Sequence, residues 1–584
     1  MRTLLIRLAF LVPALAAACT SSGGKGGDGS GGISGTGGVG IGGPGSGGSG
    51  AATGGAVGTG GKTASGGATA GGTGGRAASG GTTASGGHVA TGGGGGAGSG
   101  GAASGGAPAS GSGGTVTGGS GGKPAGGGGS PGSCAGALGD RIRVTEIDVG
   151  TAYAYNEVDN NGANLGLTPL AISPVPGGGA RLAFLGKGDS TVHILTLDAN
   201  DQVTGTAVTL PAYDFQDIYA DAGGGVVLVS RDAMGSTDNH NCGDINNLCG
   251  LVANYPTGAS CYDMYLVRFD GTAETWATKL TETSPTNPAY GAGATTGGNV
   301  IYIWSEYAHN GRIAFDGTNY AGYFGAAITV PNQACVGTST LTNGVNIHQG
   351  DRMKVVNGSG ALQSSGFDWG CSHSGYERVL WDPAAKKFIP VCKNDAATGS
   401  KSGRIAFAPG ATTIDPVDLS YSQLGSVALA GNGGYWIATS DIRDGQPAGM
   451  NGLADIHLLH VPSTSTPTPD QNILLVSDGA NDRVPHLAPY GTGQLLAAWE
   501  SSTTTGDFPQ NDSKRQMFVQ VLDAATGAPP AGAGASAAGP VMVTPNVLGS
   551  RYQDFRAFPD GSVAYPAPGS SGTKLKILRV LPCL

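Results

Sequence analysis

Four histidines lie within five residues of an arginine, a pairing that suits the binding of an anion. The pairs are His309 with Arg312, His348 with Arg352, His373 with Arg378, and His486 with Arg483. An arginine side chain holds a carboxylate or sulfate through a planar fork of N–H donors, and a histidine exchanges protons near neutral pH. Brought together, these side chains would form a ligand-binding site for an anion such as an acidic glycan.

The same neighbourhood holds side chains suited to acid–base chemistry. His348 and His373 are candidate catalytic bases, and Tyr376 is a candidate catalytic acid. Trp369 offers a flat face on which a sugar ring could stack. A structural alternative stays open for all of them, because histidine and arginine also bind backbone carbonyls and nearby carboxylates such as Asp351.

The segments that must position this site form a sevenfold repeat. In each copy a turn, usually rich in glycine, is followed by four or five residues that favour a β-strand. The turns lie at residues 177–179, 223–225, 297–298, 384–387, 433–434, 491–493 and 560–561. Between them lie runs of alternating apolar residues that end in an acid, such as 192–198 and 517–523.

One stretch of the repeat is similar to a known family. Residues 263–276, with their strand, the Asp270-Gly271 turn and Trp276, resemble the repeats of secreted bacterial β-propellers. Together with the seven copies, this resemblance implies an all-β fold, a seven-bladed β-propeller over residues 134–584. Loops of a propeller gather at one mouth of its central channel, which would bring the four pairs together. Two packed β-sandwiches are the alternative, because glycine turns recur in them too.

The two ends of this region predict how the ring closes. Residues 574–581 form a last strand with no turn after it, and residues 141–149 form a first strand with none before it. One blade built from both ends would close the ring and place Cys134 near Cys583. A disulfide closing so long a loop adds up to about 5 kcal/mol in the chain-entropy model.

The first 18 residues have the pattern of an export signal. Arg2 and Arg7 precede an apolar run that ends in three alanines and Cys19. This resembles a bacterial lipoprotein signal, in which the cysteine becomes the lipidated first residue. The chain departs from that pattern at Ala16, where leucine is usual, and an ordinary secretory signal is the alternative.

Residues 19–133 are expected to be a disordered tether. Residues 21–133 contain 54 glycines and almost no apolar side chains, so burial cannot offset the entropy of ordering them. As a flexible coil the tether would have a root-mean-square span of roughly 55–65 Å. Similar tracts follow the lipidated cysteine in many Gram-negative surface lipoproteins, which implies a spacer between the membrane and the propeller.

Eight cysteines follow the tether, an even set that favours disulfides in an exported protein. They are Cys134, Cys242, Cys249, Cys261, Cys335, Cys371, Cys392 and Cys583. Their spacings do not match the short knuckle of a structural zinc site, so no metal is predicted there. We expect Cys371 to pair with Cys392. Calcium is left open at the Asx-rich residues 159–162 and 238–247, where Asx-turns are the alternative.

The net charge of residues 134–584 limits the kinds of partner that this region could bind. Residues 134–584 hold 25 basic and 39 acidic residues, a net charge of −14. A nucleic-acid-binding domain is basic, so that class is excluded. The chain has no run of 18 apolar residues, so no membrane-spanning helix is predicted.

These observations predict a protein lipid-anchored to the cell envelope, at the outer membrane or cell surface. Its propeller would bind an extracellular ligand, a glycan or another envelope component, and no cofactor is predicted. One alternative is a lyase or hydrolase of acidic polysaccharide, and another is a protein–protein interaction scaffold. A convergent pocket of histidine and arginine would favour the binder or the enzyme, whereas a channel filled by internally paired arginines would favour the scaffold.

Overall fold

The computed structural model describes much of the chain after residue 135, all of it within the unit Gly119–Leu584. The described residues are 136–155, 169–231, 240–241, 260–281, 301–304, 311–329, 347–368, 370–371, 376–394, 404–409, 412–413, 423–443, 452–506, 508, 513–531 and 538–583. The predicted signal, Cys19 and the tether lie outside them. None of the described residues belongs to a helix long and apolar enough to cross a membrane.

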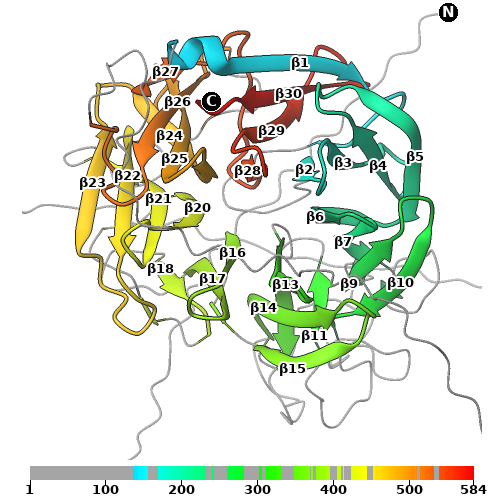
Figure 1. Cartoon of the computed structure of the whole chain (residues 1–584). Coiled ribbons are helices and arrows are strands. Elements are labelled where there is room, and N and C mark those ends of the chain that lie inside the picture. Colours follow the sequence, from blue (N-terminus) through cyan, green and yellow to red (C-terminus); the bar gives the residue numbers. More distant parts are fainter. Residues whose placement is uncertain are drawn as a thin grey trace, which may run out of the picture. The chain divides into compact units, whose positions relative to one another are not determined.

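The strands form a ring of seven antiparallel blades (Figure 1). In the part of the chain that the structure describes, five sheets have four strands and one sheet has ten. The ten-stranded sheet combines two blades, which are numbered with the others from 1 to 7 in chain order. This confirms the prediction of an all-β, seven-bladed propeller.

In four blades, neighbouring strands are consecutive in the chain. Blade 1 contains β2 (Ala171–Pro174), β3 (Ala180–Leu185), β4 (Thr191–Leu197) and β5 (Val203–Pro211). Blade 4 contains β16 (Glu377–Asp382), β17 (Lys387–Asn394), β18 (Arg404–Phe407) and β19 (Thr412–Thr413). Blade 5 contains β20 (Gln423–Leu429), β21 (Tyr435–Ile442), β22 (Ala454–Val461) and β23 (Gln471–Val476). Blade 6 contains β24 (Asn481–Tyr490), β25 (Gln494–Ser502), β26 (Gln516–Asp523) and β27 (Val541–Met542).

Blades 2 and 3 are joined by an extra strand. Blade 2 contains β6 (Asp214–Asp221), β7 (Gly224–Arg231), β9 (Ser260–Phe269) and β10 (Glu274–Lys279), with the short β8 (His240–Asn241) beside β9. Blade 3 contains β12 (Arg312–Phe315), β13 (Asn319–Thr329), β14 (Ile347–Asn357) and β15 (Leu362–Phe367). β11 (Ile301–Trp304) pairs with both β9 and β13 and so bridges the blades. The expected turn at 297–298 therefore precedes this bridging strand, and the inner hairpin of blade 3 turns between β12 and β13 instead.

Blade 7 closes the ring with both ends of the described chain. It contains β28 (Arg556–Ala557), β29 (Val563–Pro568), β30 (Lys574–Val580) and, outermost, β1 (Ile142–Asp148), which follows the 3-10 helix η1 (Leu138–Arg141). β1 pairs with β30 over its whole length, from Ile142 opposite Val580 to Asp148 opposite Lys574. The predicted closure is thus confirmed. Cys583 is disulfide-bonded, whereas Cys134 lies outside the described residues, so their pairing stays a prediction.

Glycine marks the turn from the inner to the second strand because the third strand ends beside it. Gly224 has a φ of +139°, and a Cβ added there would lie 2.0 Å from the carbonyl oxygen of Phe269, the last residue of β9. Gly434 has a φ of +79°, and its added Cβ would lie 2.4 Å from the corresponding oxygen of Val461 in blade 5. Only glycine fits both the backbone conformation and the close approach.

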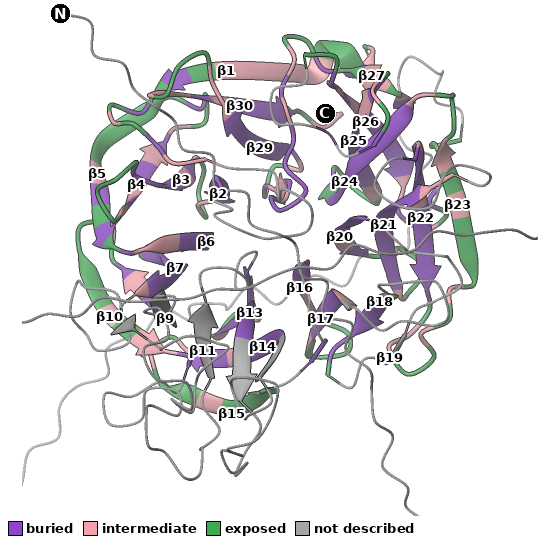
Figure 2. Ribbon diagram, turned by 180° about the vertical axis from the view of Figure 1, so that it is seen from behind, coloured by how far each residue is buried: buried purple, intermediate pink, exposed green. Residues whose placement is uncertain are grey.

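Apolar side chains hold neighbouring blades face to face, and most residues of the strands between them are buried (Figure 2). One cluster, for example, packs Val192 and Ile194 of blade 1 against Phe215 and Val227 of blade 2. Side chains on a strand alternate between its two faces, so each sheet contributes to the interface on either side. Burial therefore runs around the whole ring, and the second and third strands carry most of it.

Hydrogen bonds link the inner ends of successive blades. Gln423 in β20 accepts the backbone N–H of Val484 in β24 at 2.7 Å. Gln216 in β6 accepts the N–H of Gly311 at 2.9 Å, just before β12. These amide side chains replace the strand-to-strand bonds that separate blades cannot make, because buried backbone donors need partners.

A disulfide joins blades 3 and 4 as the sequence predicts. Cys371 follows β15 and Cys392 lies in β17, and the two sulfurs are bonded to each other. Both residues are buried. Cys242, Cys249 and Cys335 lie outside the described residues, as does the side chain of Cys261 in β9.

Candidate functional site

The carboxylate of Asp554 lies at the centre of a charged group in the central channel. Arg312 donates from Nε to Oδ2 of Asp554 at 2.7 Å. Nε of Arg378 lies 3.6 Å from Oδ1 of Asp554, and the Ser426 hydroxyl donates to the same oxygen at 3.1 Å. Asp554 precedes β28 of blade 7, whereas the arginines start the inner strands of blades 3 and 4.

Both arginines are engaged by backbone carbonyls as well. Arg378 donates to Gly425 at 2.8 Å, to Glu377 at 2.9 Å and to Arg551 at 2.6 Å. Arg312 donates to Gly311 at 2.8 Å and to the carbonyl of Tyr552. Arg312 and Arg378 are 2% and 1% exposed. These guanidinium groups therefore donate their hydrogen bonds to other groups inside the protein.

The charges in this group shift one another's proton affinity. Burial alone would raise the pKa of Asp554, but the guanidinium groups of Arg312, Arg378 and Arg556 hold it well below its ordinary value. Burial is the main cause that lowers the pKa of Arg378 to about 10, and the carboxylate of Asp554 opposes it. Asp554 is therefore ionised, and Arg378 stays protonated, at neutral pH.

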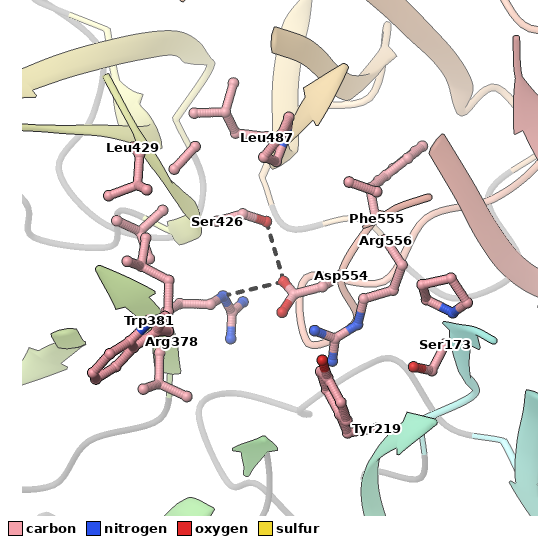
Figure 3. A pocket seen from close by; sticks show the side chains of 17 residues that line it. Ser173, Tyr219, Arg378, Trp381, Ser426, Leu429, Leu487, Asp554, Phe555 and Arg556 are labelled. Carbon is pink, nitrogen blue, oxygen red and sulfur yellow. Dashed lines mark hydrogen bonds and ion pairs between the residues drawn. The ribbon is translucent and has the colours of Figure 1, made fainter. Parts of the chain in front are cut away.

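A cavity of about 370 Å³ lies beside this charged group, on the side where the inner strands end (Figure 3). Its polar lining residues are Ser173, Tyr219, Arg378, Ser426, Asp554 and Arg556, and its other lining residues are Pro174, Val379, Leu380, Trp381, Val427, Ala428, Leu429, Leu487, Pro489, Phe555 and Ala557. They come from the inner strands of six blades and from the two residues that precede β28. The cavity therefore lies on the axis of the ring.

Arg556 is the cation in this cavity that keeps donors available. Its Nη2 pairs with both carboxylate oxygens of Asp217, and no described residue accepts a hydrogen bond from its Nε or Nη1. Figure 3 shows the guanidinium groups of Arg378 and Arg556 on either side of Asp554, with the Tyr219 hydroxyl directed toward Arg556. Burial raises the pKa of Tyr219, so its hydroxyl keeps its proton. Arg556 and Tyr219 thus present donors to the cavity.

The two other predicted arginines lie in separate networks. Arg352 in β14 pairs through Nη2 with Asp368 at 2.9 Å. Arg483 in β24 donates to Asn481 at 3.0 Å and to the carbonyl of Gly452 at 2.9 Å. Of the four predicted arginines, the structure brings Arg312 and Arg378 together on one carboxylate, and neither Arg352 nor Arg483 lines the cavity.

His486 and Tyr376 are packed among aromatic rings. The His486 ring lies 5.2 Å from that of Phe555 and 5.4 Å from that of Tyr565, measured between ring centroids. Burial lowers the pKa of His486 to about 3, so it is neutral. Tyr376 stacks on Tyr552 with centroids 5.3 Å apart and is 7% exposed. Both residues contribute to packing around the channel.

The remaining candidates fall outside what the structure describes. His309, Trp369 and His373 are not described, nor is the side chain of His348, whose backbone lies in β14. Their predicted roles in binding or catalysis stay predictions. The Asx-rich segments proposed for calcium also lie outside the described residues, apart from the backbone of β8.

Sequence reasoning missed the residues that centre the site. Asp554, Arg556 and Tyr219 carry no histidine nearby, so the pairing rule did not select them. One signal was present: residues 551–556 are a dense polar and aromatic run just before the seventh turn. Its position matches that of Arg312, Arg378 and Arg483 at the start of an inner strand, whereas Arg352 lies in β14, the third strand of blade 3.

A buried group of potential metal ligands has another explanation. Among the described residues, Asp351, Cys371 and Cys392 place ligand atoms within 4.8 Å of one another. The two sulfurs are joined in the disulfide, so they are not thiolate ligands. Asp351 accepts the backbone N–H of Cys371 at 2.6 Å and supports this junction between blades.

Comparisons with known proteins find distant likenesses alone. No protein-family model matches the chain, and no curated protein is significantly similar to it. The endo-arabinase from Bacteroides thetaiotaomicron is 14% identical, with 47% of this chain and 93% of that chain covered and a TM-score of 0.27. An α-L-arabinanase of Penicillium chrysogenum complexed with arabinobiose is 10% identical over 75% of this chain and 98% of that chain, with a TM-score of 0.33. The Dos1 propeller is 10% identical over 74% and 82%, with a TM-score of 0.34. The chain is distantly similar to these glycan-active enzymes and to another propeller, and likeness at this level does not identify a function.

Proposed function

We propose that this protein is a ligand-binding propeller whose central cavity takes an anionic group, such as the carboxylate of an acidic saccharide. The observation that carries the proposal is Arg556. It lines the cavity, and two of its nitrogens have no partner among the described residues. A guanidinium with free donors in a concave site is suited to bind a carboxylate or sulfate.

Among the described residues, the partners of the two lining arginines leave donors only on Arg556. Arg378 lies beside Asp554 and donates to backbone carbonyls, and Arg556 pairs through Nη2 with Asp217. The surrounding propeller region is strongly acidic, with a net charge of −14. An anion is therefore favoured at Nε and Nη1 of Arg556 and disfavoured over the rest of the acidic region.

The walls support a ligand with a ring or another apolar body. Trp381 and Tyr219 line the cavity, together with aliphatic residues and prolines. Aromatic rings with a polar edge bind amphipathic partners, because one face excludes water while the hydroxyl or N–H makes a bond. A volume of about 370 Å³ lies at the small end of ordinary ligand pockets, which begin near roughly 300 Å³.

The place of action is proposed from the amino terminus. The resemblance of residues 1–19 to a lipoprotein signal, followed by the glycine tract, supports a propeller tethered to the cell envelope. The ligand would then be met outside the cytoplasm. This suits an envelope or extracellular glycan, and it requires Cys19 to be the lipidated residue.

Calorimetric titration of the full chain tests the binding function. We expect galacturonate and glucuronate to bind, and the neutral sugars galactose and glucose to bind at least about tenfold more weakly, since they lack the group that Arg556 holds. The Arg556→Gln variant should lose at least about tenfold of the affinity for the acids, and Tyr219→Phe should lose several-fold.

The control variant is Arg231→Gln, whose arginine pairs with Glu274 at 2.7 Å outside the cavity. It should keep wild-type affinity. Equal binding of acidic and neutral sugars, or unchanged affinity in a folded Arg556→Gln or Tyr219→Phe variant, would overturn the proposal. Release of shortened products from acidic polysaccharide in the same samples would replace a binder with an enzyme. Binding of no sugar would favour the protein–protein scaffold.

A further inference from the structure

We infer that the central cavity is closed at its charged end and therefore binds the anionic terminus of a chain, not an internal stretch of one. This rests on the proposed function and specifies its ligand: a short acidic saccharide, or the acidic end residue of a longer one. Three features of the molecule support it: a segment that crosses the ring, the hydrogen bonds that anchor this segment, and the position of the free donors in the cavity.

Residues 550–555, here called the cross-channel segment, pass from blade 7 toward the opposite side of the ring. In a ring of seven, blades 3 and 4 lie opposite blade 7. Tyr552 packs in the hydrophobic cluster between blades 4 and 5 and stacks on Tyr376, which directly precedes blade 4. Arg312 of blade 3 and Arg378 of blade 4 reach Asp554 from the far side. Chain and side chains thus fill the axis at this level.

The cross-channel segment is anchored at both ends of its path. Gln553 accepts the N–H of Leu170 at 3.1 Å and donates to the carbonyl of Pro566 at 2.9 Å, which ties it to blades 1 and 7. The backbone N–H of Ser550 donates to the Tyr565 hydroxyl at 2.6 Å. On the far side, Arg378 holds the carbonyl of Arg551. A segment bonded on both sides and buried between them does not open for a passing chain.

The free donors lie at this closed end and the apolar residues lie toward the mouth. Arg556 lies beside Asp554 in Figure 3, next to the cross-channel segment, and the Tyr219 hydroxyl is directed toward Arg556. Pro174 and Leu429 are the last residues of β2 and β20, and Trp381 is the next to last of β16. Strand ends mark the mouth, so a ligand enters past these residues and meets the donors last.

This order of residues determines which part of a ligand can bind. An anionic group has to reach the far end of the cavity to meet Arg556, while the body behind it lies against Trp381 and the aliphatic walls. An internal residue of a polymer carries chain on both sides and needs two exits. The described residues supply an exit at the mouth and a filled channel at the other end, so only a terminal residue fits.

The test uses galacturonic acid and its oligomers, from the monomer through the trimer and decamer to polygalacturonate, titrated into the full chain. We expect the dissociation constant per molecule to stay within about threefold across the series. Calculated per uronate residue, affinity should then fall in proportion to chain length. Affinity per molecule that rises in proportion to length would overturn the inference while leaving the binding function intact. Failure of every member to bind would overturn the proposed function itself.

A pair of exposed leucines in blade 5 supplies matched variants. Leu429 lines the mouth of the cavity, whereas Leu474 in β23 lies away from it, and they are 37% and 52% exposed. Leu429→Glu should lower affinity for the trimer at least about fivefold, because the anion must pass the new charge, and raised salt should reduce that loss. Leu474→Glu should match the wild type. Equal effects of the two substitutions would overturn entry by this route.

Discussion

The two ends of the inner strands differ in chemistry, although both face the same channel. At their starts the strands bury charged and polar residues, as in β16, where Glu377 and Arg378 are 0% and 1% exposed. Toward their ends they present apolar and aromatic residues, such as Leu380 and Trp381 of the same strand. The starts are filled by the cross-channel segment and its partners, whereas the ends surround the cavity.

The difference separates buried charge from the features on which the proposed ligand binding rests. At the strand starts, Arg312 and Arg378 hold backbone carbonyls of other blades, because blades joined only by packing need polar groups to bond their inner ends. Toward the strand ends the cavity lining is mostly apolar, whereas Arg556, the first residue of β28, lies beside the filled end and keeps Nε and Nη1 without an acceptor among the described residues. The proposed binding site therefore rests on a cation with unused donors and not on a concentration of charge.

Removal of the Asp554 carboxylate should cause the largest loss of stability at the filled end of the channel. Asp554→Ala leaves Arg312 and Arg378 without their shared carboxylate, and loss of one partner of a buried ion pair costs about 3–5 kcal/mol. Since the Asp554 side chain is 14% exposed, we expect a loss near the lower end, about 3 kcal/mol. Denaturant unfolding of the full chain measures it.

The control for this variant is an exposed pair of the same chemistry. Glu274 pairs with Arg231 near the surface, and Glu274→Ala should cost less than about 1 kcal/mol. A loss for Asp554→Ala no larger than this would contradict the role given to the filled end. It would also remove the support for a closed channel.

Asp482, near the start of β24, should make stability depend on pH. Burial raises the pKa of Asp482 to about 7, and the charges of Asp478 and Asp455 add to this, while Ser501 and Arg443 oppose it. An unfolded aspartate titrates near about 3.9. Between these values the folded state keeps a proton that the unfolded state releases, so stability falls as pH rises from about 4 to 7.

The Asp482→Asn variant removes this titration. Relative to the wild type it should gain about 2–3 kcal/mol on going from pH 5 to pH 8, since each pKa unit corresponds to about 1.4 kcal/mol. Asp478→Asn is the comparison variant, because it keeps Asp482 and removes only one of the causes that raise the pKa of Asp482, so its gain between pH 5 and pH 8 should be smaller. A gain for Asp482→Asn that is the same at both pH values would disprove the assignment.

The fold could be read from the sequence because its signal is local. Glycine is required at positions 224 and 434 because the third strand of the same blade ends beside each of them. A blade with this close approach therefore has the same glycine turn. Blade 3 departs from the rule, since its inner hairpin turns at Asp316 and the glycines at 297–298 precede β11 instead. An inserted strand shifts the spacing, and spacing alone cannot show that.

The site was harder to predict because its contacts cross the ring. Arg312 and Arg378 were selected by their histidine neighbours, yet what places them together is Asp554, 242 and 176 residues away in sequence. The sequence around Asp554 and Arg556 does not indicate which of their hydrogen-bond donors and acceptors have partners in the folded protein. Which arginine is satisfied depends on carbonyls of other blades, and only the folded ring decides that.

A smaller effect distinguishes two aspartates at the other end of the inner strands, Asp382 and Asp221. The Tyr435 hydroxyl donates to Asp382 at 2.8 Å, and the Tyr320 hydroxyl donates to Asp221 at 2.7 Å. Each bond joins the end of an inner strand to the second strand of the next blade. Asp221 also pairs with Arg268, so it keeps a charged partner when the tyrosine hydroxyl is lost.

Tyr435→Phe should therefore cost more than Tyr320→Phe. We expect about 1.5 kcal/mol for the first, the value of a hydrogen bond to a charged group, and about 0.5 kcal/mol for the second. Denaturant unfolding at pH 7 measures both, and affinity for acidic sugars should stay unchanged, because neither tyrosine lines the cavity. Equal losses in the free energy of unfolding would mean that Arg268 does not compensate for the missing tyrosine hydroxyl at Asp221. A loss of ligand affinity in either variant would instead show that these two hydrogen bonds between blades hold the apolar end of the channel in shape. That end would then depend on them as the filled end depends on Asp554.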